Sequence, residues 1–158
     1  MSATARSTAT INGVVVEIAP GDTILKAAAQ IGIDIPTLCH SEHLEPEGGC
    51  RMCMVEIEGQ RVQAACHTPV APGMVVRTNT SRLEGIRRDL LALTMSALPE
   101  GSVSADACGT KFERMLAAYG VRGGDLGAAR ERGNGAVDES HPYIRFERDK
   151  CITCRLCL

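Results

Sequence analysis

Hydrophobic residues in the first eighty positions follow the periods of short strands and of one helix. Apolar runs at 9–11 and 14–18 flank Asn12-Gly13, the dipeptide most typical of a two-residue β-hairpin turn. A helix is expected next, capped by Asp22 and ended by Gly32. Its apolar residues recur at helical spacing: Ile24, Ala27, Ala28 and Ile31. A hairpin followed by a helix that packs across the sheet is the opening of a β-grasp fold.

A second hairpin and a final strand come after an irregular polar stretch. Residues 54–57 and 62–65 alternate around a turn at 58–60, and residues 74–78 form the last strand. We therefore expect an α+β domain of the β-grasp type over residues 1–79, of which residues 1–7 are small and polar.

Two further helices are predicted by their capping boxes. Ser81 with Glu84 starts a helix that runs to about residue 97, with an apolar face of Leu83, Ile86, Leu90 and Leu93. Thr110 with Glu113 starts a second helix that Gly120 ends, with an apolar face of Phe112, Met115, Leu116 and Tyr119. These helices make residues 80–121 a helical extension.

The remaining chain divides into a linker and a short terminal segment. Residues 122–140 are rich in Gly, Ala, Arg and Glu without any period, which is typical of a linker. Strand-like alternation resumes at 141–146, and residues 141–158 form the last segment.

Four cysteines lie in and around the irregular stretch, at Cys39, Cys50, Cys53 and Cys66. The ten residues between the first two are too polar and too rich in Gly and Pro for a helix or a strand, so they must wrap. Gly48 and Gly49 can bring backbone N–H groups close to a sulfur, where amide dipoles stabilise negative charge. Since soft thiolates suit iron-sulfur clusters, we interpret these cysteines as the metal ligands of a [2Fe-2S] cluster.

Three other uses of these cysteines have to be weighed. A structural zinc site usually takes two Cys-x2-Cys knuckles, and this stretch has one. Disulfides need an oxidising compartment, but residues 1–10 contain no apolar signal core. A Rieske centre needs two histidine ligands; His40, His43 and His67 lie nearby, yet four cysteines already complete a site. We expect these histidines to lie at the surface or around the cluster.

The spacing Cys-x10-Cys-x2-Cys-x12-Cys, preceded by Ile35-Pro36-Thr37-Leu38 and with Gly-Gly before the second cysteine, resembles one oxidoreductase family. The resemblance is to the N-terminal [2Fe-2S] domain of three proteins. They are the large iron-sulfur subunit of NADH:quinone oxidoreductase, the diaphorase small subunit of NAD-reducing hydrogenase and the catalytic subunit of NAD-dependent formate dehydrogenase. Plant-type ferredoxins have four residues in the first gap. The resemblance covers nearly the whole chain and implies a central position for the strand at 74–78.

One cluster site of this family is missing from the sequence. In its longer members a His-x3-Cys-x2-Cys-x5-Cys site for a [4Fe-4S] cluster lies between the two helices of the extension. Residues 98–110 here contain no histidine and one cysteine, Cys108. Since one thiolate cannot hold four irons, we expect that cluster to be absent and Cys108 to be a small, partly buried free thiol.

The chain ends in a second cysteine motif. Cys151, Cys154 and Cys157 match the first three cysteines of a bacterial-type Cys-x2-Cys-x2-Cys-x3-Cys ferredoxin motif, a partial [4Fe-4S] site. The fourth cysteine would come after Leu158, so we expect the sequence to be the N-terminal piece of a longer polypeptide. In a complete chain the three thiols would stay empty, hold a three-iron cluster, or borrow a ligand from a partner or from Cys108.

Composition narrows the setting in which the chain works. A net charge of −2 argues against nucleic-acid and acidic-membrane partners, and no run of eighteen apolar residues is present to span a membrane. Eight cysteines without a secretory signal indicate metal ligation in a reducing cytoplasm. Apolar residues make up 44%, enough for a core, but aromatic residues only 3%.

We expect an electron-transfer module, because the residues offer no substrate site. No nucleotide-binding glycine fingerprint follows a strand, and no hydrolytic nucleophile has a base beside it. By resemblance, the parent enzyme is a molybdopterin-type, NAD-dependent formate dehydrogenase. The partners would then be a molybdopterin domain and a flavin subunit that reduces NAD. Alternatives are a subunit of an NADH dehydrogenase or hydrogenase diaphorase and a small subunit of an amine, proline or cyanide-forming dehydrogenase. From a different class, a structural zinc-binding interaction domain also remains open.

Overall fold

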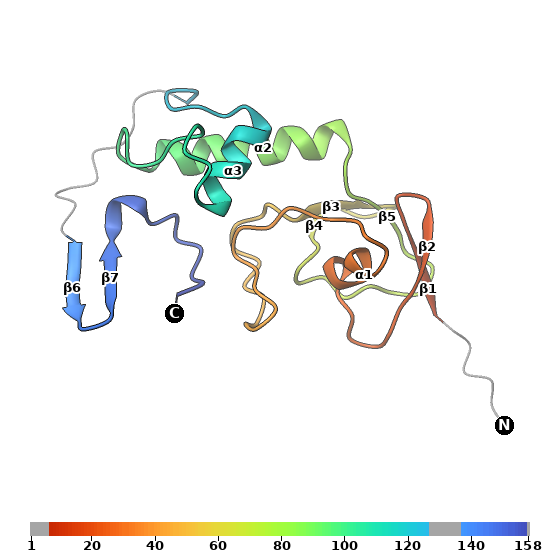
Figure 1. Cartoon of the computed structure of the whole chain (residues 1–158). Helices are drawn as coiled ribbons and strands as arrows, with labels where there is room; N and C mark the ends of the chain where they lie inside the picture. The colour runs from red at the N-terminus through yellow and green to blue at the C-terminus, as the bar shows by residue number, and fades with distance from the viewer. Residues whose placement is uncertain (1–6, 127–136, 158) are drawn as a thin grey trace. The chain divides into compact units, whose positions relative to one another are not determined.

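A five-stranded mixed sheet forms the body of the N-terminal half of the chain (Figure 1). The computed structural model describes residues 7–126 and 137–157. Within them the strand order is β2-β1-β5-β3-β4, with β5 parallel to β1 and antiparallel to β3. The strands are β1 (Thr8–Ile11), β2 (Val14–Glu17), β3 (Met54–Ile57), β4 (Gln63–Ala64) and β5 (Val75–Arg77). The central place of β5 and the α+β class are as predicted.

The first hairpin turns at Asn12-Gly13, as the sequence predicts. Both residues have positive φ, 50° at Asn12 and 84° at Gly13, which is the backbone that a two-residue hairpin turn requires. The Asn12 side chain also accepts from the Thr78 N–H at 2.8 Å and donates to the Thr78 Oγ1 at 2.7 Å. The turn between β1 and β2 is therefore fastened to the end of the central strand β5.

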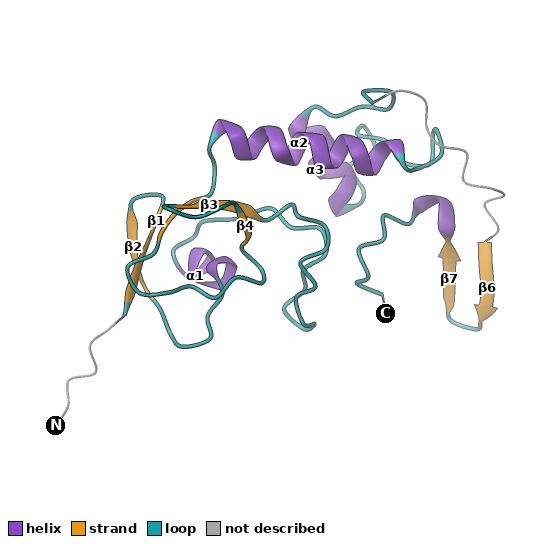
Figure 2. Ribbon diagram, turned by 180° about the vertical axis from the view of Figure 1, so that it is seen from behind, coloured by secondary structure: helices purple, strands orange, loops and turns teal. Residues whose placement is uncertain are grey.

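The helix α1 (Ile24–Gln30) packs against the sheet and carries the core of this unit. Figure 2 shows the short helix with strands on one side and the long irregular loop beyond it. Ile24, Ala27 and Ala28 are buried against apolar residues of the strands. Backbone bonds tie its first residues to the chain after β4, from Ile24 N–H to Thr68 O and from Leu25 N–H to Ala65 O, both at 3.0 Å.

The predicted N-cap of this helix is wrong by one residue. Thr23 is the N-cap, and its side chain accepts from the Lys26 N–H. Asp22 is buried and accepts instead from the Ala19 N–H at 3.0 Å, and it pairs with Lys26 at 2.8 Å. The hydrogen bond from the Lys26 side chain, followed by that from Ala19, lowers the pKa of Asp22 below its usual range. Asp22 thus anchors the loop that enters the helix.

The chain divides into two compact units, with one boundary between Gly85 and Ile86, inside helix α2 (Ser81–Ser96), and a second between Arg155 and Leu156. The predicted cap is again displaced by one, because Thr80 accepts from the Leu83 N–H at 3.3 Å. The buried positions are Leu83, Arg87, Leu91 and Ala92, whereas Leu93 of the predicted face is exposed. The buried stripe therefore follows i, i+4, i+8, i+9 and includes an arginine.

Helix α3 (Lys111–Tyr119) confirms its predicted capping box. Thr110 accepts from the Glu113 N–H at 3.1 Å, and the Glu113 carboxylate accepts from the Thr110 N–H at 2.9 Å. The bond from the Thr110 backbone is the main cause of a pKa of Glu113 below its usual range. Gly120 ends the helix with φ 64°, and the buried face contains Phe112, Met115 and Leu116.

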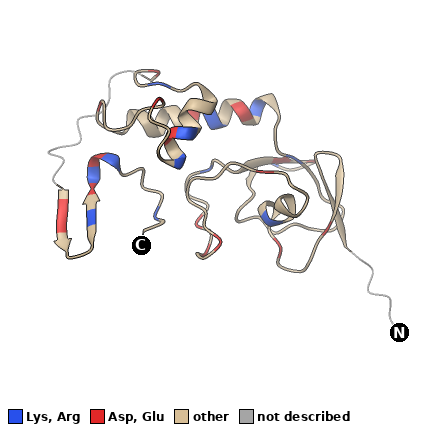
Figure 3. Ribbon diagram, viewed as in Figure 1, with Lys and Arg blue, Asp and Glu red and all other residues tan. Residues whose placement is uncertain are grey.

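The predicted linker ends earlier than expected. Residues 127–136 lie outside the described part of the chain, but Val137–His141 forms strand β6, which pairs with β7 (Ile144–Glu147). A short 3₁₀ turn, η1 (Arg148–Lys150), follows. Figure 3 shows acidic residues on β6 and basic residues on β7, and Arg145 lies 3.5 Å from Glu139. Pairing of opposite charges across the two strands stabilises this hairpin. The composition of the segment had predicted a linker instead.

The described residues include no helix that is long and apolar enough to cross a membrane.

Replacing Asn12 tests whether the turn fastens the sheet. Asn12→Ala removes two hydrogen bonds. It also places alanine, whose side chain cannot make a hydrogen bond, at positive φ. Together these changes should lower the free energy of unfolding by about 2–3 kcal/mol. Asn12→Gly keeps the backbone free and should cost about 1 kcal/mol less. Urea unfolding of the metal-free chain followed by far-UV circular dichroism measures both, and equal stability of all three chains would contradict the assignment.

Candidate metal centre

Three separate segments bring cysteine thiols to one end of the sheet. Cys39 follows the buried Ile35 and Leu38 on the chain that leaves α1. Cys53 immediately precedes β3, and Cys66 lies just beyond β4. The register Met54 opposite Ala64, together with a bond from the Ala65 N–H to the Cys53 O at 2.9 Å, sets these two cysteines beside each other. Cys39, Cys53 and Cys66 are buried, and Cys50 is half-buried.

Cys39 and Cys50 form the first pair. The Cys50 N–H donates to the Cys39 Sγ at 3.4 Å, so the second cysteine solvates the first through its backbone. Burial raises the pKa of the Cys39 thiol, while the N–H groups of Cys50 and Gly49 act in the opposite direction. Donation from these N–H groups is the stabilisation of sulfur charge that the Gly-Gly sequence predicts.

Positive φ at two positions lets the loop close around this pair. Gly48 has φ 63°, which glycine adopts without strain, but Gly49 is not in the left-handed region. Arg51 is there instead, with φ 58°. Its residue type does not predict this, because a non-glycine residue takes that conformation only where its surroundings impose it. Arg51 reverses the chain between Cys50 and Cys53.

Cys53 and Cys66 form the second pair. A hydrogen bond from the Cys66 thiol is the largest cause of a lowered Cys53 pKa, to about 6, and backbone N–H groups of Cys66 and Ala65 add to it. The same bond, followed by burial, raises the pKa of Cys66. Cys53 is therefore the readier thiolate of this buried pair. The charges of Cys39 and Cys50 raise the Cys66 pKa further, so both pairs lie within electrostatic reach of each other.

The four thiols are arranged as two pairs. Among residues 7–126 and 137–157, no three or more His, Cys, Asp or Glu side chains are placed to hold a single metal ion. A structural zinc needs all four thiolates on one ion, whereas each iron of a [2Fe-2S] cluster takes two thiolates and shares two bridging sulfides. We infer that Cys39 and Cys50 would hold one iron, and Cys53 and Cys66 the other.

The three histidines of this region differ in burial. His43 and His67 are exposed. His40 is half-buried, and its Nδ1 is buried without a hydrogen-bond partner among the described residues. Their positions agree with the expectation of surface or surrounding groups.

The remaining cysteines lie in other surroundings. Cys108 is exposed rather than partly buried as expected, and its thiol donates to the Ala105 O at 3.2 Å. Cys151 and Cys154 are half-buried and Cys157 is exposed. The Thr153 N–H donates to the Cys151 Sγ at 3.4 Å, and Thr153 and Arg155 both have positive φ, at 56° and 59°. The terminal motif therefore shares a feature with the first cysteine pair, a backbone N–H group that donates to a cysteine sulfur.

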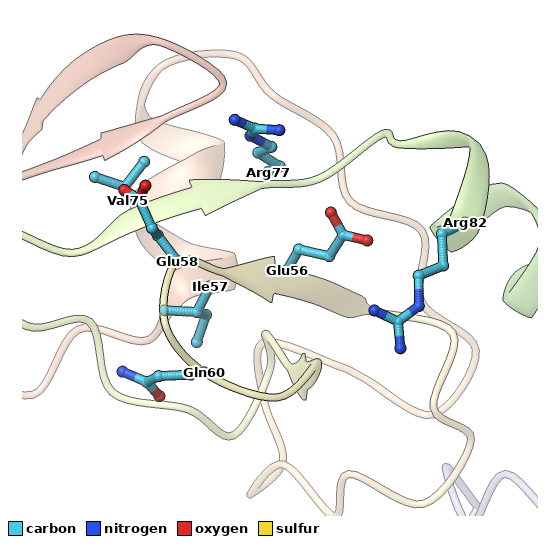
Figure 4. Close-up of a pocket in the computed structure, with 7 residues that line it drawn as sticks. All are labelled: Glu56, Ile57, Glu58, Gln60, Val75, Arg77 and Arg82. Atoms are coloured by element: carbon cyan, nitrogen blue, oxygen red, sulfur yellow. The ribbon is translucent and has the colours of Figure 1, made fainter.

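A separate hollow of about 330 Å³ lies over β3 and β5 and contains no thiol (Figure 4). Its charged lining residues are Glu56, Glu58, Arg77 and Arg82. Figure 4 shows the Glu56 carboxylate between the two arginines, so the charges of this hollow balance. It offers no ligand set for iron.

The comparison with protein families decides the cofactor. A family described as "2Fe-2S iron-sulfur cluster binding domain" matches residues 5–81, a span that contains the two thiol pairs. Residues 5–81 therefore match a [2Fe-2S] domain. The resemblance drawn from the cysteine spacing is confirmed, and the cofactor of the domain is a [2Fe-2S] cluster.

Similar proteins extend the match beyond the [2Fe-2S] domain. The chain is 38% identical over 156 residues to a subunit of an NADH-quinone oxidoreductase from Rhizobium meliloti, covering 94% of this chain and 18% of that protein. It is 39% identical to "NADPH-Fe(3+) oxidoreductase subunit alpha" of Geobacter sulfurreducens, with the same coverage. The chain thus spans about a fifth of the length of these relatives.

A solved structure matches as well. It is the "Crystal structure of NAD+-reducing [NiFe]-hydrogenase in the H2-reduced state", with a TM-score of 0.82 and 30% identity. The match covers 96% of this chain and 64% of that one.

Serine substitutions test the ligand assignment. Cys50→Ser should remove most of the iron and sulfide bound after anaerobic reconstitution, because serine lacks the soft thiolate that iron needs. Cys108→Ser should leave both unchanged, since its thiol is exposed and hydrogen-bonded elsewhere. Iron and acid-labile sulfide assays measure the outcome, and equal loss in both variants would overturn the assignment.

A matched pair of glycine substitutions tests the loop geometry. Gly48→Ala places alanine at positive φ, which strains the backbone by about 1 kcal/mol. The variant should therefore lose its cluster to a chelator with a half-life about fivefold shorter. Gly49→Ala should be tolerated, because its φ is outside the left-handed region and no atom lies within 4 Å of the added Cβ. Loss of visible absorption with time gives the half-life; the reverse order of the two variants would refute the geometry.

Proposed function

We propose that this chain is an electron-transfer iron-sulfur module that relays single electrons within a multi-cofactor, NAD(P)-linked oxidoreductase. The observation that carries the proposal is the two thiol pairs, three of whose four cysteines are buried, within a match to a [2Fe-2S] domain. When bound, the cluster would supply reversible one-electron chemistry. The described residues offer no comparable site for a substrate.

The protein's contribution is to hold the cluster and to set its potential. Met52, Cys53 and Cys66 are almost fully buried, which limits the access of water to these thiols. Backbone N–H groups of Cys50 and Gly49 face the first pair, and those of Ala65 and Cys66 the second. Such donors stabilise the extra negative charge of the reduced state and raise the reduction potential.

The names of similar proteins support redox partners that exchange electrons with a nicotinamide nucleotide. NADH, NADPH and NAD+ each appear in the names of the relatives and of the solved structure. We therefore propose a partner subunit that carries flavin and binds NAD(P), in a reducing cytoplasm. A molybdopterin domain would be a further partner if the parent enzyme is a formate dehydrogenase. This hypothesis is favoured by the absence of a histidine-containing cluster site between residues 98 and 110.

The terminal cysteines are proposed as part of a second relay. Cys151, Cys154 and Cys157 would bind a [4Fe-4S] cluster when a further cysteine is supplied by a longer chain or a partner. The N–H contact to the Cys151 sulfur and the positive φ of its neighbours support this use. The reading frame after Leu158 would test the source of the further cysteine. A pterin-binding continuation there would also identify the parent enzyme as a formate dehydrogenase.

Reduction of the reconstituted chain tests the proposed function directly. The cluster should make the protein red-brown, and dithionite should bleach the visible absorption and produce an electron paramagnetic resonance signal that integrates to one spin for each cluster. A colourless protein that takes up stoichiometric zinc and shows no such signal would establish the structural zinc alternative instead.

A further inference from the structure

A cavity of about 520 Å³ opens beside the loop that carries Cys50, and the chain on either side of Cys66 also lines it. Its walls contain Gly48 and Arg51, which flank Cys50, and Ala64 and His67, which flank Cys66. Arg61, from the turn between β3 and β4, completes the charged lining. The hollow therefore borders the backbone that holds both thiol pairs.

The charge of this hollow is not balanced by the protein. Arg51 and Arg61 are exposed, and neither side chain has a hydrogen-bond or ion-pair partner among the described residues. The lining contains one carboxylate, Glu47, which already has an interaction of its own. Glu42 and Glu45 of the same loop do not line the cavity. Two guanidinium groups thus face one carboxylate here, whereas the hollow of Figure 4 is lined by two arginines and two glutamates.

Resting on the proposed function, we infer that this hollow is the docking site for an acidic segment of the protein that exchanges electrons with the [2Fe-2S] cluster. Guanidinium groups recognise carboxylates through paired N–H donors. Complementary charge at a redox contact orients the partners and speeds their encounter. A partner seated here would reach the backbone next to Cys50 and Cys66 without displacing the loop.

The experiment measures how charge at this site controls electron release. The full chain is reconstituted and reduced, and its oxidation is followed by stopped flow at about 0.1 M ionic strength, where screening confines the effect to charges within about 10 Å. Two oxidants are compared, the anion ferricyanide and the cation hexaamminecobalt(III). In each reaction one electron leaves one reduced cluster and reduces one oxidant ion.

Charge removal at the site should act oppositely on the two oxidants. Arg61→Gln should slow ferricyanide about fivefold and speed hexaamminecobalt(III) by a similar factor, by the Coulomb energy of one charge near a trivalent ion. Arg51→Gln should do the same if it retains the cluster. Arg61→Lys, which keeps the charge, should match the unmodified chain. Arg77→Gln makes the same change of net charge in the hollow of Figure 4 and should leave both rates nearly unchanged.

A peptide competitor distinguishes a protein segment from a small anion. Hexaglutamate should slow ferricyanide oxidation saturably in the unmodified chain and about fivefold less effectively in Arg61→Gln, whereas hexalysine should not slow it. Equal effects of Arg77→Gln and Arg61→Gln would overturn the proposal. Inorganic phosphate that competes as well as hexaglutamate would also overturn it and indicate a small-anion site. A parent chain that dithionite does not bleach would refute the proposed function itself.

Discussion

The structure depends on keeping four thiols in two adjacent pairs although they come from three segments of chain. The β3–β4 pairing fixes Cys53 against Cys66, and the wrapped loop returns Cys50 to Cys39 with its N–H on the Cys39 sulfur. Its hydrogen bond to Cys53, burial and the charges of the neighbouring cysteines raise the pKa of Cys66, so gathering four thiolates at one place costs free energy. The sheet, the helix and the turns of this unit hold these groups together against that cost.

The rest of the first unit supports this constraint. Helix α1 makes backbone bonds to Ala65 and Thr68, residues on either side of Cys66, so the helix and the last cysteine are positioned together. Asn12 fastens the first hairpin to Thr78 at the end of the central strand. Polar contacts far apart in sequence thus stabilise the frame, while the charged surface around Arg51 and Arg61 faces outward for a partner.

The sequence was sufficient where a pattern is local and has one solution. The cysteine spacing, the Asn12-Gly13 turn and the box of Thr110 with Glu113 are of this kind. Sequence reasoning failed where neighbouring residues compete, as when Thr23 and Thr80 cap helices instead of Asp22 and Ser81. Sequence reasoning also could not predict features that depend on tertiary contacts or cross-strand pairing. These are the positive φ of Arg51, the burial of Arg87 and the hairpin that begins at Val137.

Native mass spectrometry of one variant tests the central claim most directly. In this variant Cys108, Cys151, Cys154 and Cys157 are all replaced by serine, so the two inferred pairs are the only thiols left. After anaerobic reconstitution the account predicts a mass increase equal to two irons and two sulfides, with loss of the four thiol protons. A variant that gains no mass, or gains the mass of a single zinc ion, would contradict it.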